Sequence, residues 1–306
     1  MLRLYTHPAC LQHDPGPGHV ERPSRLRAVL QALDHDRFAA LDRIEAPPVT
    51  REQLLRVHGA AHVAEILAGP PPGEMLALDQ DTVMGAGSTE AALRAAGAVV
   101  AAVDAVLGGT TRRAFCAVRP PGHHATADRS MGFCLFNNIA VGAAHALAAH
   151  GLKRVAIADF DVHHGNGTQE QIWRAPSVLF ASRHEMPLYP GSGHPDERGA
   201  GNILNRPLSA GDGPYLFREL WEGDLLPRLH AFKPQLVLVS AGFDAHQRDP
   251  LANLCLGSED YAWITAKLVE LANRHADGRL VSTLEGGYDL SALAASAAAH
   301  VEALLD

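Results

Sequence analysis

One segment near the middle of the chain concentrates residues that could hold a metal ion. Directly after the apolar run 155–158 comes the sequence DFDVHHGNGT, residues 159–168. Side chains at i and i+2 of an extended chain point to the same side, so Asp161 and His163 could bind one ion together. Buried carboxylates and imidazoles without partners cost free energy, which a metal would offset. The alternative is a polar turn that caps a strand and starts the next helix.

Similar polar clusters follow three further apolar runs. Four expected strands, 113–118, 154–158, 235–240 and 279–283, each lead into residues capable of chemistry. In the same order the clusters are RPPGHH (119–124), the DFDVHH segment, AGFDAH (241–246) and LEGGY (284–288). The carboxyl ends of parallel strands lie along one edge of a sheet, and ligands bind there. Four segments that deliver His, Asp and Tyr to one edge predict an active site.

The expected metal ligands are two carboxylates and one imidazole, from Asp161, His163 and Asp244. Three protein ligands leave a position open for water and substrate, as catalytic zinc requires. A second metal in this site would need further carboxylates close by, but glycines occupy the neighbouring positions 165 and 242. We therefore predict one metal ion per chain in this site.

Two histidines and a tyrosine are candidates for proton transfer and charge stabilisation. His123 and His124 follow Pro-Pro-Gly, and the ordinary pKa of histidine lies near neutrality, as proton transfer requires. Tyr288 follows two glycines and could donate its hydroxyl to a developing oxyanion. Taken alone, the histidines favour a solvated turn, and the tyrosine is equally consistent with packing over a turn. The case for chemistry comes from their position beside the expected metal.

The elements that must position these residues form an α/β pattern. We expect strands at the four runs above and at 177–181, and helices at 24–33, 53–67, 137–150, 214–230, 258–275 and 290–305. Continuously apolar strands separated by helices indicate a parallel sheet covered on both faces. The prediction is a three-layer αβα fold around a central, mostly parallel sheet. No linker, repeat or low-complexity tail marks a second domain, so one domain is expected over residues 1–306.

Composition narrows the classes of function. The 306-residue chain is 47% hydrophobic and carries a formal net charge of −8. That charge argues against a partner with nucleic-acid phosphates and leaves open a cationic substrate. Four scattered cysteines without a CxxC pair exclude a cysteine-only zinc site and fit a reducing cytoplasm. We find no signal peptide and no membrane-spanning run, so no membrane partner is expected; the oligomeric state is left open.

Six motifs in a fixed order carry a resemblance to a known family. They are RPPGHH (119–124), GFC (132–134), DFDVHHGNGT (159–168), GFDAH (242–246), DPL (249–251) and LEGGY (284–288). Together they resemble the zinc-dependent histone deacetylase family, within the arginase–deacetylase superfamily, from about His13 to the last helix. The resemblance implies an arginase/deacetylase-like fold and a zinc-dependent amidohydrolase. Asn166, where the first class of the family has a carboxylate, makes the chain similar to class II-like bacterial deacetylases.

The resemblance implies a role for each catalytic residue. The zinc ligands would be Asp161, His163 and Asp244. Tyr288 would polarise the amide carbonyl together with the metal. His124, oriented by Asn166, would take a proton from the zinc-bound water and pass it to the leaving amine. His123, paired with Asp159, would act mainly through its charge.

The resemblance also implies a second ion and a substrate channel. A structural K⁺ would lie near the zinc, with ligands from Asp159, Asp161, His163 and Ser182. Gly132, Phe133 and Tyr189 would line the narrow channel through which an acylated side chain reaches the metal. An aspartate would hold the substrate backbone at the rim. Asp79 and Asp81 both fall in the right neighbourhood, and Asp81 is the preferred choice.

The remaining alternatives differ in substrate and in activity. The expected substrate is acetyl-lysine in a protein or peptide, and the main alternative is an acetylpolyamine. Polyamine-selective members of the superfamily tend to place an acidic residue directly after Asp-Pro, where this chain has Leu251. The single-metal ligand count disfavours a ureohydrolase. A catalytically inert acyl-binding module is a more distant alternative, because neither a ligand nor the tyrosine is missing.

Overall fold

The structure, a computed structural model, describes residues 2–306; Met1, at the start of the expected domain, lies outside them. Within residues 2–306, eight strands form one sheet in the order β2-β1-β5-β10-β9-β6-β7-β8, and all neighbouring strands run parallel. The strands are β1 (Leu2–Thr6), β2 (Asp42–Glu45), β5 (Arg113–Cys116), β6 (Val155–Asp159), β7 (Val178–Ser182), β8 (Ile203–Asn205), β9 (Leu236–Ala241) and β10 (Leu280–Leu284). A separate antiparallel pair joins β3 (Leu76–Ala77) to β4 (Val83–Met84).

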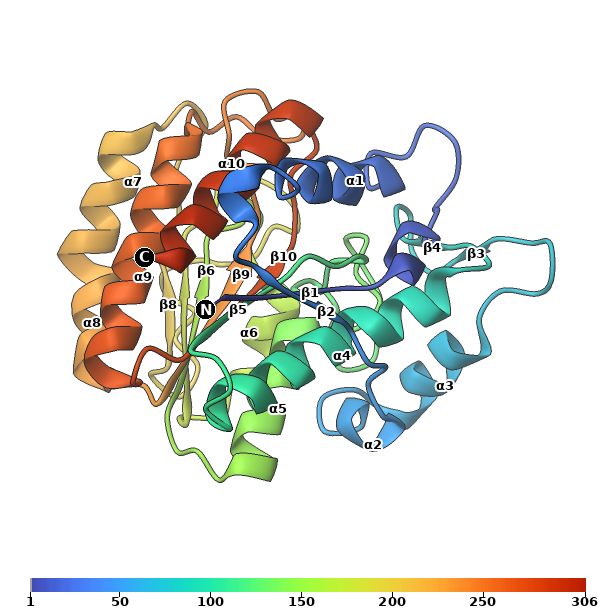
Figure 1. Cartoon of the computed structure of the whole chain (residues 1–306), viewed down its shortest axis with the longest axis horizontal. Coiled ribbons are helices and arrows are strands. Elements are labelled where there is room, and N and C mark those ends of the chain that lie inside the picture. The colour runs from blue at the N-terminus through green and yellow to red at the C-terminus, as the bar shows by residue number, and fades with distance from the viewer. Residues whose placement is uncertain (1) are drawn as a thin grey trace.

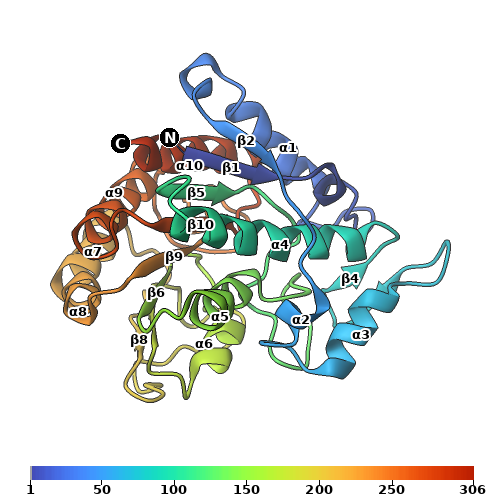
Figure 2. The ribbon, with the colours of Figure 1, turned by 60° about the horizontal axis from the view of Figure 1, so that its bottom comes forward.

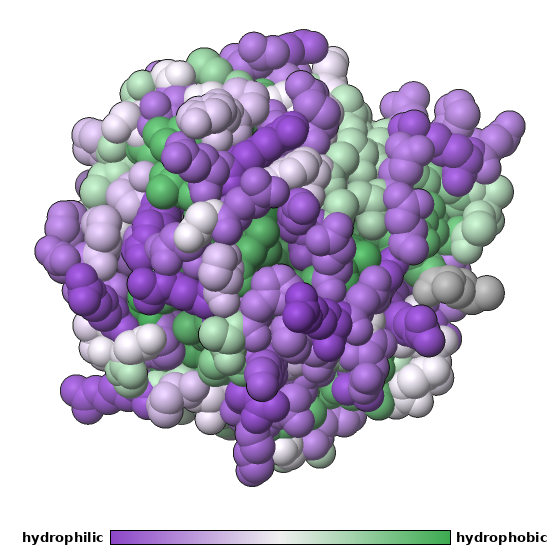
Figure 3. All heavy atoms as spheres, turned by 90° about the vertical axis from the view of Figure 1, so that its left-hand side faces the viewer, coloured by the Kyte–Doolittle hydropathy of each residue, from purple (hydrophilic) through white to green (hydrophobic). Residues whose placement is uncertain are grey.

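Helices cover both faces of the sheet, which confirms the predicted three-layer αβα fold. Two of them, α4 and α5, pack on one face, and α9 and α10 pack on the other (Figures 1 and 2). The helices are α1 (Pro23–Ala32), α2 (Arg51–Leu54), α3 (Ala60–Ala68), α4 (Ser88–Leu107), α5 (Asn138–His150), α6 (Asn166–Ile172), α7 (Pro214–Leu220), α8 (Leu226–Phe232), α9 (Ser258–His275) and α10 (Leu290–Leu305). The face that carries α7 and α8 is covered mainly by hydrophilic side chains (Figure 3).

The inner strands are buried along their whole length, as their continuous apolar sequences predict. β6 (VAIAD), β9 (LVLVSA) and β10 (LVSTL) have every residue buried, because helices cover both sheet faces. The strand order makes β5, β10, β9 and β6 consecutive neighbours. These are the four strands expected to lead into the polar clusters. Their parallel direction therefore delivers all four clusters to the same edge of the sheet.

Two predicted helices differ from the observed ones. The helix expected at 53–67 is wrong as one element: α2 ends at Leu54 and α3 begins at Ala60. Between them, Gly59 donates its N–H to the Ala127 carbonyl at 2.8 Å, and a Cβ at Gly59 would lie 2.1 Å from Asp128 Oδ1. This close approach to a neighbouring loop interrupts the helix. The helix expected at 214–230 is divided by a π-helical stretch at Trp221–Leu225, next to Pro227, whose missing N–H breaks the regular ladder.

Several further elements were not predicted from the sequence. The edge strand β2 has alternating partial burial, and β8 is three residues long. The Ala-rich α4 is the longest of these elements, and it packs against α5 and β5. Among residues 2–306 no helix combines the length and apolarity needed to cross a bilayer.

Candidate active site

The polar clusters meet at the carboxyl ends of the four central strands. Asp161 and His163 follow β6, Asp244 follows β9, Tyr288 follows β10, and the histidine pair at 123 and 124 follows β5. All these side chains are at least nine-tenths buried. The convergence expected from strand direction is therefore present in the structure.

Asp161, His163 and Asp244 place three donor atoms around one point. His163 Nδ1 lies 3.1 Å from Asp161 Oδ1 and 3.2 Å from Asp244 Oδ2. The two carboxylates are almost completely buried, with exposed fractions of 1% and 0%. Two carboxylate oxygens and one imidazole nitrogen are a donor set that suits zinc. The same three residues form a possible metal-binding group by the proximity of their donor atoms.

The backbone around these carboxylates fixes them in place. Gly286 N–H donates to Asp161 Oδ2 at 2.8 Å, and Val162 N–H donates to Asp244 Oδ1 at 2.9 Å. Asp244 Oδ2 is buried and has no hydrogen-bond partner within the described residues. A Cβ at Gly286 would lie 1.9 Å from this oxygen, and one at Gly242 would lie 2.0 Å from Asp161 Oδ2. The residues present therefore fit a metal ion: glycines make room for two carboxylates, and one oxygen is left without a hydrogen bond.

The electrostatics of this group favours a cation. Burial lowers the pKa of His163, but the adjacent carboxylates of Asp161 and Asp244 outweigh burial and raise that pKa to about 10. Burial and the neighbouring Asp161 raise the pKa of Asp244. Both shifts have the same origin, which is two negative charges packed together away from water. A divalent cation would offset that charge.

The two adjacent histidines have opposite electrostatic environments. His123 Nδ1 lies 3.0 Å from Asp159 Oδ2, and although burial opposes protonation, Asp161 and Asp159 raise the pKa of His123 to about 10. Burial, together with the charges of His123 and His163, holds the pKa of His124 well below its ordinary value. The rings lie 4.0 Å apart between centroids. His123 therefore favours the charged form, and His124 favours the neutral form.

Asn166 selects which nitrogen of His124 can act as a base. Its Oδ1 lies 2.8 Å from His124 Nδ1, while its amide nitrogen lies 3.4 Å from the His124 carbonyl. The amide oxygen can only accept, so Nδ1 of His124 carries the proton. His124 lines the cavity described below, and in this tautomer its Nε2 is the nitrogen with a free lone pair. The neutral partner Asn166 orients the ring without adding a charge.

Tyr288 is held by contacts that do not involve its hydroxyl. Asp249 Oδ2 accepts its backbone N–H at 2.7 Å, and the Arg25 guanidinium lies 4.7 Å from its ring centroid. Arg25 also donates to the carbonyls of Gly287 and Glu285, each at 2.6 Å. Burial raises the pKa of Tyr288 well above its usual value, in spite of the nearby Arg25. The phenol therefore stays protonated and can donate a hydrogen bond.

A cavity of about 230 Å³ leads to these groups. It is lined by the five residues expected to contact substrate, by three residues of the site and by one further leucine: Asp81, Gly132, Phe133, Tyr189, Leu251, His124, His163, Tyr288 and Leu188. Asp79, the other rim possibility, does not line it and instead accepts the Asp81 N–H at 3.1 Å. Gly132 has φ 55° and a Cβ there would lie 2.5 Å from His124, so the channel wall requires glycine at this position.

Ser182, one of the predicted potassium ligands, lies next to another of them, Asp159. It ends β7 directly beside Asp159 in the parallel register with β6, and its hydroxyl lies 2.9 Å from His184 Nδ1. Both Ser182 and Asp159 are fully buried. The position of Ser182 suits the predicted potassium site, which stays a prediction.

Sequence reasoning missed a set of buried charged residues behind the site. Arg25 and Arg119 share the carboxylate of Glu21, and all three side chains are fully buried. Glu285 Oε2 accepts the N–H of Gly122 at 2.6 Å and of His123 at 3.2 Å, so it ties the histidine loop to the loop after β10. The i,i+4 spacing of Glu21 and Arg25 was the one local signal. The pairing with Arg119 spans 98 positions and has no local signature.

Comparison with known proteins agrees with this geometry. The family model "Histone deacetylase domain" matches residues 19–304. A histone deacetylase-like amidohydrolase of Pseudomonas aeruginosa is 42% identical over 91% of this chain and 79% of its own length. A probable deacetylase of Archaeoglobus fulgidus is 38% identical over 93% of this chain and 80% of its own length. The crystal structure of the HDA15 HD domain superposes with a TM-score of 0.94, at 36% identity, over 99% of this chain and 88% of that one.

These matches cover nearly the whole chain, and they confirm the resemblance and the enzyme class predicted from the motifs. Zinc dependence is a feature of the family. The central sheet and its helical layers likewise have the arrangement of the matched HDA15 HD domain. The chain belongs to the histone deacetylase family and is an amidohydrolase of that family.

Proposed function

We propose that this protein hydrolyses the amide of acetyl-lysine in a protein or peptide, releasing a carboxylate and a free amine. The observation that carries the proposal is the composition of one cavity. The cavity is lined by His163 of the possible metal-binding group, by the neutral histidine base His124 and by the protonated Tyr288. Such a channel fits a straight acylated side chain, with the reacting carbonyl at its inner end.

Asp161, His163 and Asp244 would hold one Zn²⁺ per chain. When bound, the metal supplies Lewis-acid polarisation of the carbonyl and acidifies water. Nε2 of His124 takes the proton from the attacking water and later delivers it to the leaving amine. Tyr288 donates its hydroxyl to the carbonyl oxygen as negative charge develops there.

The other site residues orient the catalytic groups, supply charge beside them or contact the substrate. Asn166 keeps His124 in the tautomer that exposes Nε2. His123 and Asp159 form a charged pair at the base of the site, and His123 acts through its positive charge. Asp81 at the cavity rim would accept hydrogen bonds from the substrate backbone. Tyr189, half exposed at the rim, would form one wall of the acyl channel.

The preference for lysine over polyamine rests on Leu251. It lines the cavity and its backbone N–H is fixed by Asp249 Oδ1 at 3.0 Å. An apolar residue there offers no partner for a second ammonium, which costs free energy when desolvated. The observation that favours an acetylpolyamine substrate is Asp81, which lines the same cavity and could bind a distant ammonium. We keep acetyl-lysine as the proposed substrate, because Leu251 stands where polyamine-selective members of the superfamily tend to place an acidic residue.

A substrate profile tests the proposal. The purified enzyme is assayed against a fluorogenic acetyl-lysine peptide and against acetylated polyamines at matched concentrations, with and without a chelator. We expect turnover of the peptide with the higher kcat/KM, and loss of turnover on chelation. Binding without turnover would indicate an inert acyl-binding module. A tenfold or greater preference for acetylpolyamines would contradict the argument from Leu251. Asp81 would then be the candidate binding site for the second ammonium.

We also propose a structural K⁺ at Asp159, Asp161, His163 and Ser182, and a single catalytic domain over the whole chain. Potassium dependence of thermal unfolding, compared with sodium, tests the ion site.

The four cysteines are free, with Cys10, Cys116 and Cys134 buried and Cys255 exposed. Free thiols support a reducing compartment, and we propose the cytoplasm. The partner we propose is an acylated peptide or small molecule, with no nucleic acid or membrane partner.

A further inference from the structure

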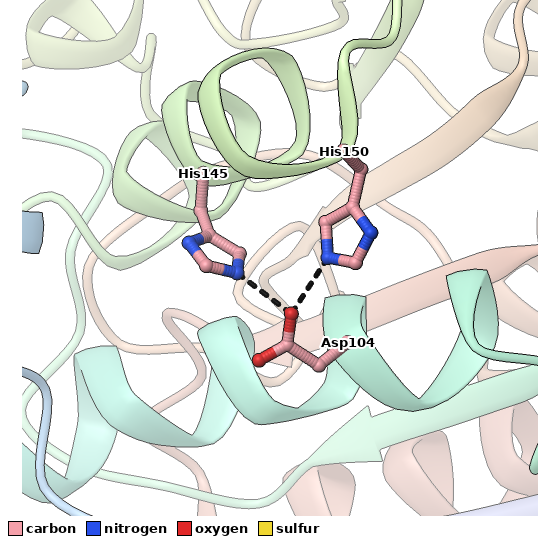
Figure 4. A group of neighbouring side chains, drawn as sticks. All are labelled: Asp104, His145 and His150. Atoms are coloured by element: carbon pink, nitrogen blue, oxygen red, sulfur yellow. Dashed lines mark hydrogen bonds and ion pairs between the residues drawn. The ribbon is translucent and has the colours of Figure 1, made fainter.

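A second group of ligand-bearing side chains lies where α4 packs against α5 (Figure 4). Asp104 comes from α4, and His145 and His150 come from α5. Helix α5 begins beside the active site, where its cap Asn137 contacts the His123 carbonyl, and it runs for 13 residues. That length corresponds to about 20 Å, so the cluster lies towards the opposite edge of the sheet. It plays no part in the proposed hydrolysis.

The two imidazoles both contact the same carboxylate oxygen of Asp104. Asp104 Oδ1 lies 2.7 Å from His145 Nε2 and 2.7 Å from His150 Nε2. The side chain of His145 is 8% exposed, that of His150 is 28% exposed and that of Asp104 is 53% exposed. Two imidazoles are therefore anchored on one helix while the carboxylate on the other helix faces water. Burial raises the pKa of Asp104, but its hydrogen bonds with His145 and His150 outweigh burial, so that pKa is lowered overall.

Two imidazole nitrogens and one carboxylate oxygen are the donors that zinc, nickel and copper ions prefer. The three donor atoms lie within 4.8 Å of one another. Metal bonds of about 2.0–2.2 Å hold such donors about 3.0 Å apart in octahedral coordination and about 3.4 Å apart in tetrahedral coordination, so the 2.7 Å contacts need to open by about 0.3–0.7 Å. His150 is the last residue of α5 and can rotate to allow this. The exposed side of Asp104 leaves room for water molecules as the remaining ligands.

Arg56 opposes a metal at this position. Its guanidinium lies 3.1 Å from His145 Nδ1, and a guanidinium can only donate. Nδ1 of His145 is therefore an acceptor, and the proton of the neutral ring lies on Nε2, where it bonds to Asp104. A metal on Nε2 requires that proton to move to Nδ1, where it would face the N–H of Arg56. Arg56 is also bonded to Glu52 at 3.0 Å and is partly exposed, so it can turn away from the ring.

We propose that Asp104, His145 and His150 form a second, exchangeable site for a divalent first-row transition metal, and that Arg56 competes with the metal by holding His145 in the non-binding tautomer. The metal replaces both Nε2 protons, and each neutral ring then carries its proton on Nδ1. The ion would join α4 to α5 in place of two hydrogen bonds. Because this site is partly exposed and the active-site group is buried, dialysis should remove the second metal and leave the first.

Titration with Ni²⁺ alone tests the proposal on zinc-loaded protein that carries no histidine tag. Isothermal titration calorimetry should detect one further Ni²⁺ per chain, with the original zinc still present by elemental analysis. His150→Gln and Asp104→Asn should each weaken Ni²⁺ binding by at least about tenfold. Ni²⁺ should raise the thermal unfolding temperature of the wild type and not that of His150→Gln.

Two further variants make the test specific. His275→Gln removes a histidine from another surface pair, in which His230 Nδ1 and His275 Nε2 lie 3.0 Å apart, and should leave Ni²⁺ affinity within about twofold. Arg56→Gln keeps all three ligands and should tighten Ni²⁺ binding. The metal site is refuted if no additional Ni²⁺ binds or if His150→Gln binds like the wild type. Unchanged or weaker binding by Arg56→Gln refutes the competition.

Discussion

Replacing Tyr288 with phenylalanine removes one hydroxyl and very little else. The ring remains under Arg25, whose guanidinium lies 4.7 Å from the ring centroid, and the backbone N–H remains bonded to Asp249 at 2.7 Å. Neither contact uses the hydroxyl, so the phenylalanine ring should occupy the same place. The zinc-binding group is separate from this side chain, so metal content should be unaffected.

The expected loss is that of a single oxyanion donor. Such a donor contributes about 2.7–4 kcal/mol to transition-state stabilisation, which corresponds to a reduction of roughly 10²–10³ in kcat. Because the hydrogen bond strengthens only as charge develops, kcat and kcat/KM should fall together and KM should change little. The raised pKa of Tyr288 keeps the phenol protonated, so the loss should be the same throughout the neutral pH range.

The assay is steady-state hydrolysis of an acetyl-lysine peptide, with zinc measured in the same preparations. Tyr189→Phe is the matched control, since it removes a hydroxyl from another tyrosine that lines the same cavity. We expect the control to lose much less activity than Tyr288→Phe. A kcat within tenfold of the wild type for Tyr288→Phe would refute the oxyanion role and leave the residue a structural one. Loss of zinc from this variant would show that the side chain supports the metal group instead.

Three further predictions address the metal, the base and the substrate. Asp161→Ala and Asp244→Ala should each abolish zinc retention and activity together, because each removes a ligand and leaves the other carboxylate buried without a cation; retention of zinc after dialysis would contradict this assignment. Asn166→Asp should raise the pKa of His124 by placing a negative charge beside Nδ1. Because catalysis needs the neutral base, the acidic limb of the pH–rate profile should then move to higher pH, and an unchanged limb would show that another group controls it. Leu251→Glu should raise kcat/KM for acetylpolyamines relative to acetyl-lysine peptides, and an unchanged ratio would exclude this position as a determinant of specificity.

The central part of the fold was predictable because its strands are buried on both faces. Continuous apolar sequence at β6, β9 and β10 indicates that environment directly, and the polar residues after each strand indicate the functional edge. The peripheral elements were less predictable. β2 and β8 are short strands near the sheet edges, and their pairing depends on β1 and β7 rather than on their own sequence.

The site was predictable where its chemistry is local, and it was missed where support comes from distant residues. Asp161 and His163 lie two positions apart on one segment, so their cooperation is visible in the sequence. Arg25 reaches carbonyls 260 and 262 positions away, and no pattern around it indicates these contacts. The rim aspartate stayed open between two positions because both lie in one irregular loop, and only Asp81 lines the cavity.

The strand order has a consequence for how the molecule is made. Among residues 2–306, β10 is synthesised after the other seven strands of the sheet, yet it lies between β5 and β9 in the middle of the sheet. Until it inserts, both of its neighbours present unpaired edges, which are prone to wrong pairing with other chains. Its arrival also supplies the Gly286 N–H that fixes Asp161, across 125 positions of sequence. Assembly of the metal-binding group should therefore be a late event in folding, and metal uptake by a nascent chain should begin only after residues 280–288 have emerged.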